Sequence, residues 1–388
     1  MAGDGAPSVG ILPIGALGVA FFYHLTEGLR RVDGNVVLVQ RRGAVDRWSG
    51  AATLRVEAPS GPIDLPLTDL LVDDLAAIAG SPAMPDVILV TTNPDQLFTV
   101  LTEFVGVVEH EHREGRLESG RARLPVLVLC SNGIYFQRTR ANFIELLEEA
   151  TLLGRLPDLW PDLMPQLVGR VMRGVTIQTS VRRGSGPSAL YRPGPSGRTR
   201  ITGGDRATRA RVVAQLAELG GWFEDAGSAT PTRVEFDKAL VNLASNVFGQ
   251  LDAIDGSGAF RTLTVAEIVR PQQFGRIRDL VTAVVRVGQG VGAYHANETS
   301  EEIFNRTIEW LKPAAAHVPS SVQWIEQQLA EGTLIPGLAP TETWLMKPLQ
   351  HYAKSLGDVA ATAYFEQLEA DVIAAVSRAV ARQETGRI

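Results

Sequence analysis

The sequence predicts an α/β fold in which a doubly wound, mostly parallel sheet precedes an all-helical domain. Two observations lead to this prediction. In the first half, short apolar runs alternate with helical patterns, as in parallel β-α-β units. From about Asp205 the apolar residues recur with helical spacing almost to the end of the chain. We therefore expect an α/β domain over residues 1–204 and a helical domain over residues 205–388.

Length and composition restrict the possible classes of protein. The chain has 388 residues, enough for two domains with separate cores. A net charge of −6 argues against a general nucleic-acid binder or a membrane-surface protein. Cys130 is the single cysteine, which excludes an intramolecular disulfide and a cysteine zinc site. The first apolar run lacks a basic leader and contains Pro13 and His24, so we expect a cytoplasmic protein.

The most informative segment runs from Val9 to Gly18, where an apolar strand breaks into a tight turn and then a helix over residues 19–25. The N–H groups at such a helix N-terminus can receive a dinucleotide pyrophosphate. Gly15 lets a phosphate approach the backbone, and Gly18 lets helix and strand pack closely. Pro13 departs from the G-x-G-x-x-G pattern because it lacks an N–H and replaces the first glycine. The predicted cofactor-binding residues of this turn are Pro13, Ile14, Gly15, Ala16, Leu17 and Gly18.

The other elements of the first half follow from similar patterns. Strands are expected over residues 35–42, 86–93 and 124–132, with a strand pair over 51–66 that turns at 59–62, and further strands over 170–204 that extend the sheet. A helix is expected from about Pro94. The charged stretch 108–123 predicts a surface loop, with His110 and His112 solvated rather than bound to a metal.

In the second half, helices are expected over residues 206–220, 232–251, 264–293, 300–311, 319–330 and 341–383. Two of them have broad apolar faces, at 264–293 and 352–383. These faces could form a homodimer through the helical domain, or they could pack against each other within one chain. The sequence leaves both arrangements open.

The end of the second strand indicates the cofactor. An acidic residue there would hold the ribose 2′-OH of NAD, whereas this chain has Gln40-Arg41-Arg42. A guanidinium group can pair bidentately with a 2′-phosphate. Arg41 and Arg42 therefore favour NADP(H), although a solvated basic turn is the simpler alternative.

A second informative pattern comprises Lys238, Asn242 and Asn246, whose i, i+4, i+8 spacing forms one stripe along a helix. Apolar residues occupy much of the remaining circumference, so this helix should be largely buried. An ammonium and two amides are costly in such a place unless they face a polar cleft. Exposed positions are the alternative, but asparagine is unfavourable inside a helix. The stripe therefore favours a functional role.

Several blocks, in the correct order, resemble the ketopantoate reductase (2-dehydropantoate 2-reductase) family of NADPH-dependent 2-oxoacid reductases, which act in pantothenate biosynthesis. These are the glycine turn, Asn132-Gly133, residues 170–178 and 194–203, the Lys238 stripe, Ser320-Ser321 and Thr341-Glu342. Nearly the whole chain is covered, with extra residues at 108–123, about 140–168 and 331–340. The resemblance implies a Rossmann-type NADP-binding domain followed by a domain like the C-terminal domain of 6-phosphogluconate dehydrogenase.

The resemblance also implies roles for individual residues. The lysine matching Lys238 is the general acid, because an ammonium stabilises the charge that grows on a carbonyl oxygen and supplies its proton. Glu342 is implied as the second catalytic residue, which helps to hold the lysine or the substrate. No metal is required. The implied substrate-binding residues are Asn242, Asn246, Ser321 and Asn132, and the implied cofactor site also includes Asn93 and Asn132.

Three departures from the family pattern concern the substrate pocket. Where ketopantoate-reducing members usually carry a second lysine, this chain has Thr92-Asn93-Pro94. The usual Asn-Gly after the glutamate is replaced by Lys347-Pro348, and Pro348 should break or kink the long helix. The acid expected after Ser321 is displaced, with Glu326 the nearest candidate. These changes favour a related reductase that acts on a different oxo acid or ketone.

Two alternatives remain open. An opine- or 3-hydroxyacid-type dehydrogenase shares the order of a nucleotide domain followed by helices. A histidine-based acid pair would favour the opine type, but no histidine lies beside Lys238 in sequence. A non-catalytic NADP-binding sensor would also account for the departures at Pro13, Asn93 and Lys347-Pro348. In each case the expected partner is a small molecule, without nucleic acid or membrane.

Overall fold

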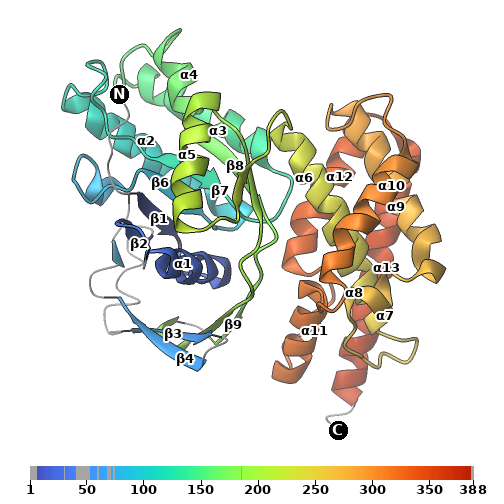
Figure 1. Ribbon diagram of the computed structural model, residues 1–388. Coiled ribbons are helices and arrows are strands. Elements are labelled where there is room, and N and C mark those ends of the chain that lie inside the picture. The colour runs from blue at the N-terminus through green and yellow to red at the C-terminus, as the bar shows by residue number, and fades with distance from the viewer. Residues whose placement is uncertain are drawn as a thin grey trace. The chain divides into compact units, whose positions relative to one another are not determined.

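The computed structural model describes residues 7–29, 31–40, 53–58, 61–67, 71–72, 75–184 and 186–385 (Figure 1). The chain forms two compact units. Unit 1 comprises Met1–Ser131 and Phe136–Pro231, and unit 2 comprises Asn132–Tyr135 and Thr232–Ile388. The short segment Asn132–Tyr135 therefore belongs to the helical unit, although it follows a strand of unit 1.

Unit 1 is built on an eight-stranded sheet with the order β12-β11-β8-β7-β6-β1-β2-β5. The apolar runs β2, β6 and β7 are buried along most of their length, as expected for strands covered on both faces. Neighbouring strands from β5 to β8 are parallel, whereas β11 is antiparallel to β8. The strands are β1 (Ser8–Leu12), β2 (Asn35–Val39), β5 (Leu71–Val72), β6 (Val87–Val90), β7 (Val126–Leu129), β8 (Val171–Thr176), β11 (Thr199–Gly203) and β12 (Phe223–Asp225).

The direction in which the chain crosses this sheet reverses between β1 and β6. A doubly wound sheet binds its ligand at the carboxyl ends of the strands beside such a reversal. Right-handed crossovers then place α1 on one face and α2 and α3 on the other. The helices of this unit are α1 (Ala16–Gly28), α2 (Leu97–Arg113), α3 (Phe136–Leu152), α4 (Leu163–Val168) and α5 (Arg206–Leu219).

Helix α1 packs between the large sheet and a smaller one (Figure 1). The small sheet has the order β4-β3-β10-β9 and consists of β3 (Thr53–Ala58), β4 (Gly61–Pro66), β9 (Ser180–Arg183) and β10 (Leu190–Pro193). The predicted strand pair at 51–66 is the antiparallel pair β3–β4. The prediction that all strands of 170–204 extend the large sheet was right for β8 and β11 but wrong for β9 and β10. Their exposed side chains, such as Arg183, suit a small open sheet better than a sheet covered on both faces.

Helix α5 and strand β12 belong to unit 1, because β12 pairs with β11 and α5 packs on β12. Phe21 of α1 stacks on Trp222, with 5.4 Å between the ring centroids. The first unit therefore continues past residue 204 to Pro231. The boundary between the compact units thus lies after the predicted boundary at residue 204, and the segment between the two is 205–231. That segment contains one short strand as well as the expected helix.

The predicted surface loop at 108–123 begins later than expected, because α2 continues to Arg113. Glu111 is fully buried, and its carboxylate accepts hydrogen bonds from the Arg116 side chain and the Arg123 N–H. The bonds from Arg116 hold the pKa of Glu111 below its usual value. The loop that follows α2 is therefore held by hydrogen bonds to the buried Glu111 carboxylate.

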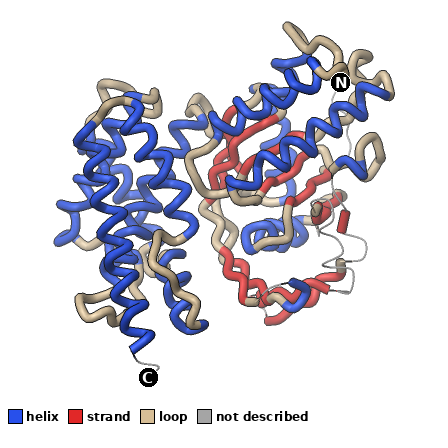
Figure 2. Tube along the Cα trace, turned by 180° about the vertical axis from the view of Figure 1, so that it is seen from behind, coloured by secondary structure: helices blue, strands red, loops and turns tan. Residues whose placement is uncertain are grey.

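Unit 2 consists of helices joined by loops (Figure 2). No helix in the described ranges is long and apolar enough to cross a bilayer. The elements are α6 (Pro231–Asn242), a π-helical turn (Leu243–Val247), α7 (Phe248–Ala253), α8 (Val265–Ile268), α9 (Phe274–Gly290), α10 (Ser300–Leu311), α11 (Ser320–Glu331), α12 (Pro340–Ser355) and α13 (Val359–Thr385).

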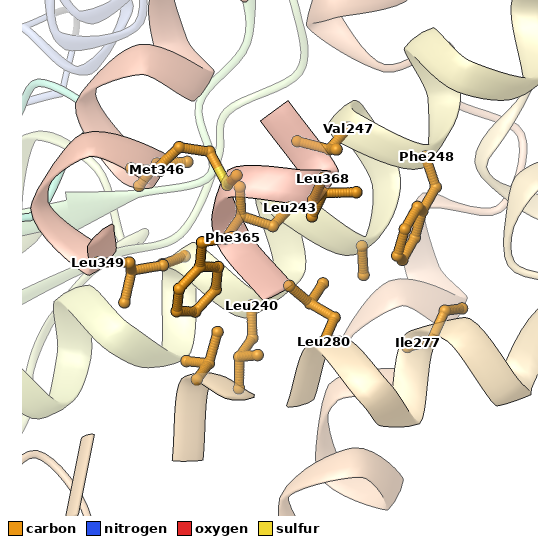
Figure 3. Packing of buried hydrophobic residues seen from close by; sticks show 14 of the residues in the cluster. Leu240, Leu243, Val247, Phe248, Ile277, Leu280, Met346, Leu349, Phe365 and Leu368 are labelled. Carbon is orange, nitrogen blue, oxygen red and sulfur yellow. The ribbon is translucent and has the colours of Figure 1, made fainter. Parts of the chain in front are cut away.

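One hydrophobic core joins most of these helices. Figure 3 shows side chains of α6, the π turn and α7 gathered against α9, α12 and α13; those labelled are Leu240, Leu243, Val247, Phe248, Ile277, Leu280, Met346, Leu349, Phe365 and Leu368. The apolar faces predicted at 264–293 and 352–383 therefore pack against each other within one chain, as the second of the two open arrangements proposed.

Three long helices of the prediction are interrupted in the structure. The helix at 232–251 contains the π turn, and the one at 264–293 breaks before Pro271. The helix at 341–383 divides at Gly357, whose φ of +68° ends α12. Of the break or kink predicted at Pro348, the break was wrong, because α12 continues through this residue. Pro348 lies inside α12, and the next subsection shows why the helix tolerates it.

Gly18→Ala should destabilise unit 1, because an added Cβ would lie 2.3 Å from the Pro13 carbonyl oxygen. We expect the free energy of unfolding to fall by about 1–3 kcal/mol, as for other overpacked sites, measured by urea denaturation. Gly15→Ala is the matched control, because its Cβ meets nothing within 4 Å. It should cost no more than about 1 kcal/mol, the cost of a poorer N-cap. Equal losses in the two variants would contradict this account of the turn.

Candidate functional site

The turn after β1 has the features of an anion-binding helix N-terminus. Helix α1 begins at Ala16 after the extended N-cap Gly15, no side chain caps it, and its first turn holds no acidic residue. Thr91, after β6, donates from its N–H and its hydroxyl to the Leu12 carbonyl, which joins the ends of β1 and β6. The Leu12–Pro13 peptide bond is cis. The N–H groups of the first turn therefore face the point where the sheet reverses.

The two glycines of the turn differ in what surrounds them. The space where a Gly15 side chain would lie is open, whereas the backbone of Pro13 packs against Gly18. The geometry thus suits the predicted roles of ligand approach at Gly15 and close packing at Gly18. Ile14, Ala16 and Leu17 complete the turn and the start of the helix, as predicted.

Two buried polar atoms near this edge have no hydrogen-bond partner within the described part of the chain. They are Nε2 of Gln40, after β2, and Oγ1 of Thr92, after β6. Buried polar groups are almost always satisfied, so these atoms mark a place where a polar ligand fits. Asn93 follows Thr92 and is exposed. Arg41 and Arg42 lie outside the described residues.

In unit 2, Lys238 and Asn242 lie on α6 roughly 160° around the helix from Leu240, which faces the core. Lys238 is partly buried and Asn242 is 7% exposed. The two side chains therefore share the side of α6 that faces away from the hydrophobic core, as the predicted stripe requires.

Asn246 lies in the π turn, so the prediction of one straight stripe through all three residues was wrong in detail. A π turn replaces i→i+4 bonds by i→i+5 bonds and is frequent at functional sites. The Asn246 carbonyl accepts a hydrogen bond from the buried Ser321 hydroxyl at 2.9 Å. This bond holds the first turn of α11 against the π turn. A substrate carboxylate would have to compete for the Ser321 proton.

Glu342, in the first turn of α12, has a fully buried carboxyl group. Burial raises the pKa of Glu342 to about 8, an effect that its own backbone N–H and the nearby Asn246 side chain only partly offset. Neither carboxyl oxygen has a well-formed hydrogen bond among the described residues. At neutral pH this group is therefore a protonated acid with unused hydrogen-bonding capacity.

The segment Asn132–Tyr135 binds both helices that carry the predicted catalytic residues. The Ile134 N–H donates to the Trp344 carbonyl at 3.1 Å, and the Tyr135 N–H donates to Glu235 Oε1 at 3.2 Å. Trp344 follows Glu342 by two residues, and Glu235 precedes Lys238 by three. Unit 2 thus brings Asn132 together with the helices of Lys238 and Glu342.

Pro348 explains how the Trp344 carbonyl is available. In an α-helix the N–H of residue 348 would bond to the carbonyl of residue 344, but proline has no N–H. The Ile134 N–H takes this place. Lys347, the other replaced residue, forms an ion pair with Glu369 of α13 at 2.6 Å. Both departures from the family pattern therefore have partners in this structure.

Sequence reasoning missed two groups near the predicted site. His317, before α11, is half-buried, and its pKa is lowered by burial and then by the charge of nearby Lys238. The earlier observation that no histidine neighbours Lys238 holds in sequence but not in space. Glu235 could have been noticed as a carboxylate in an apolar helix. Glu326, the candidate for the displaced acid, accepts instead from the Thr262 hydroxyl at 2.8 Å.

Comparison with known proteins gives structural similarity only. No protein-family profile matches the sequence. No curated protein sequence matches it either. The structure of D-mandelate dehydrogenase with NADH and anilino(oxo)acetate is 15% identical and has a TM-score of 0.62, covering 95% of this chain and 98% of that one.

Two further structures cover most of the chain. A probable 2-dehydropantoate 2-reductase from Bacillus subtilis is 14% identical, with a TM-score of 0.57 over 94% of this chain and 99% of that one. The fold is that of the ketopantoate reductases. Octopine dehydrogenase in complex with NADH and agmatine is 10% identical, with a TM-score of 0.56 over 95% of this chain and 90% of that one. The predicted fold class and the resemblance to the ketopantoate reductase fold are confirmed.

The Glu342 carboxyl should make stability depend on pH. Its folded pKa of about 8 exceeds that of an unfolded glutamate, so the folded state holds the proton more tightly. The contribution of this group is greatest below the unfolded pKa and decreases as pH rises towards 8, by about 1.4 kcal/mol per pH unit. Glu342→Gln should remove this slope.

The measurement is urea unfolding of the wild type and Glu342→Gln between pH 5.5 and 8.5. All other carboxyl groups titrate equally in both proteins, so the difference between the two curves isolates Glu342. Two curves that run parallel across this range would contradict a protonated Glu342.

Proposed function

We propose that this protein is a nicotinamide-dinucleotide-dependent reductase that converts a 2-oxo acid or a related ketone to the corresponding alcohol. The observation that carries the proposal is the arrangement in unit 2. There, Lys238 and Asn242 share one side of α6, and the segment after Asn132 is hydrogen-bonded both to α6 and to α12, the helix that carries the buried, protonated Glu342. The fold, common to ketopantoate reductases and D-mandelate dehydrogenase, supports the same activity.

Unit 1 supplies a fitting place for the cofactor. The uncapped N-terminus of α1 and the open space at Gly15 suit a pyrophosphate. Gln40 Nε2 and Thr92 Oγ1, which have no partner among the described residues, can bind polar atoms at the same edge of the sheet. Arg41 and Arg42, next in sequence after Gln40, favour the 2′-phosphate of NADP(H). The described residues contain no cluster of three or more His, Cys, Asp or Glu side chains suited to a metal ion.

When bound, the reduced nicotinamide supplies a hydride to the carbonyl carbon of the substrate. Negative charge then grows on the carbonyl oxygen, and the Lys238 ammonium stabilises it and donates a proton from Nζ. The substrate is reduced to an alcohol and the dinucleotide is left oxidised, while Lys238, now neutral, regains its proton from water. The Asn242 and Asn246 amides hold the substrate by hydrogen bonds.

The protonated Glu342 suits an anionic substrate. An ionised glutamate would repel a substrate carboxylate, whereas a neutral carboxylic acid can donate a hydrogen bond to it. The raised pKa thus has a functional consequence: the same burial that makes Glu342 costly to ionise makes it a donor at neutral pH.

A second candidate, an opine-type dehydrogenase, is favoured by one observation. His317 lies near Lys238, so a histidine is available in the site for acid–base chemistry. The similarity to octopine dehydrogenase supports the same reading. Such an enzyme would need an amine in addition to the 2-oxo acid.

Lys238→Ala should lower kcat by about 10²- to 10⁴-fold, the usual contribution of a positioned general acid. Binding of NADPH, followed by fluorescence titration, should change little, because the proposed phosphate-binding turn lies in unit 1. Lys354→Ala is the control, since this exposed lysine pairs with Glu366 on the surface of the helical unit. Wild-type turnover in Lys238→Ala would overturn the assignment.

A substrate panel separates the candidate functions. Oxidation of NADPH and of NADH is measured with 2-oxo acids of increasing size, including ketopantoate and phenylglyoxylate, each with and without arginine or agmatine. We expect turnover without the amine and a lower KM for NADPH than for NADH. Strict dependence on the amine would favour the opine-type enzyme. Tight NADPH binding without turnover of any compound would favour a sensor and overturn the proposed reductase.

A further inference from the structure

We propose that Pro348 is a positioning residue for Asn132, because it reserves the Trp344 carbonyl for the N–H of Ile134. This inference rests on the proposed function and on the substrate-binding role that the family resemblance implies for Asn132. Pro348 is the residue that replaces the family's usual glycine, and its position inside a helix is otherwise unfavourable.

The first step of the argument is the hydrogen-bond balance of α12. A residue with an N–H at 348 would bond to the Trp344 carbonyl and complete the helix. Proline removes this donor, and its ring also crowds the carbonyl four residues earlier. In this structure the Trp344 carbonyl accepts the Ile134 N–H at 3.1 Å. The hydrogen bond that Pro348 removes from α12 is thereby replaced by one that places the segment Asn132–Tyr135.

The second step is the close approach of the two backbones. Gly133 has a φ of +137°, a conformation that favours glycine. An added Cβ at Gly133 would lie 3.2 Å from Trp344 Cβ and 3.3 Å from the Trp344 carbonyl oxygen. Gly133 and Pro348 therefore serve the same contact, one by leaving room and the other by leaving an acceptor.

The third step is that the segment is held on both sides of Asn132. Before it, the fully buried Arg173 donates to the carbonyls of Ser131, at 2.8 Å, and Leu129, at 2.6 Å. After it come the bond of Ile134 to Trp344 and that of Tyr135 to Glu235. Within unit 2, the two bonds that follow Asn132 fix the backbone beside it, which limits the directions its amide can take.

The test is Pro348→Ala, which restores the N–H that competes for the Trp344 carbonyl. Because alanine suits a helix better than proline, the melting temperature should stay the same or rise. Hydrogen exchange of the Ile134 amide should become about five- to tenfold faster, the equivalent of one weakened hydrogen bond. With the 2-oxo acid that the wild type reduces fastest, kcat should fall by about 10- to 100-fold through misplacement of Asn132. The dissociation constant for NADPH should change little.

Pro340→Ala is the matched control, because Pro340 begins the same helix, where an N–H has no partner in any case. It should leave both Ile134 exchange and kcat as in the wild type. A Pro348→Ala protein with wild-type exchange at Ile134, or with faster exchange but unchanged kcat, overturns the proposal. If Pro348 had only a structural role, Pro348→Ala would lower the melting temperature and kcat together. That result would also contradict the proposal.

A second pair of variants tests the hydrogen bond from Arg173 that holds Ser131. Arg173→Met removes the donors to Ser131, whereas Arg170→Met removes a similar bond to the Leu124 carbonyl, before the other end of β7. At equal loss of melting temperature, only Arg173→Met should accelerate exchange in residues 131–135. Equal acceleration in both contradicts an anchor at Ser131. A wild type that turns over no 2-oxo acid would overturn the proposed function, while the exchange data would still decide whether Pro348 positions this segment.

Discussion

The backbone bond between Ile134 and Trp344 is the interaction on which the arrangement of the helical unit's polar residues depends. A segment that leaves a parallel strand would otherwise form an ordinary loop of the α/β unit. Together with the bond from Tyr135 to Glu235, it ties the residues after β7 to α6 and α12. These helices carry Lys238 and Glu342 close to the two bonds. Two backbone N–H groups thus bind the helices that carry Lys238 and Glu342 to one short segment of the chain.

Some of the buried polar atoms that lack a partner among the described residues lie where the proposed ligands would bind. Each buried donor or acceptor without a partner costs about 1–3 kcal/mol, so such groups are rare in folded proteins. Among the described residues, such atoms include the Glu342 oxygens in the helical unit, and Gln40 Nε2 and Thr92 Oγ1 at the edge of the sheet. They lie where the proposed function expects the substrate and the dinucleotide to bind. A ligand that satisfies them recovers free energy that the unliganded fold has lost.

The sequence predicted the local patterns well because they depend on neighbouring residues. The strand–turn–helix around Gly15 and Gly18 and the α6 stripe of Lys238 and Asn242 follow from periodicity and from glycine geometry. The π turn could not be predicted, since no residue type in Leu243–Val247 distinguishes it from an α-helix. The pairing of β10 with β3, and the nearness of His317 to Lys238, bring together distant parts of the chain. Periodicity carries no information about such contacts.

The effect of replacing Asn-Gly by Lys347-Pro348 is ambiguous in the sequence, whereas the structure shows which partners the two residues have. From the sequence, proline in a helix indicates a break, and lost Asn-Gly indicates a damaged site. In the structure, Lys347 pairs with Glu369, and the carbonyl that Pro348 leaves without an N–H accepts Ile134. In a site that has lost its function, nothing selects for replacements that find partners. An unpaired helix carbonyl or an unpaired ammonium would be tolerated there equally well. The replacements therefore favour the proposed reductase over a protein in which the corresponding site has been abandoned.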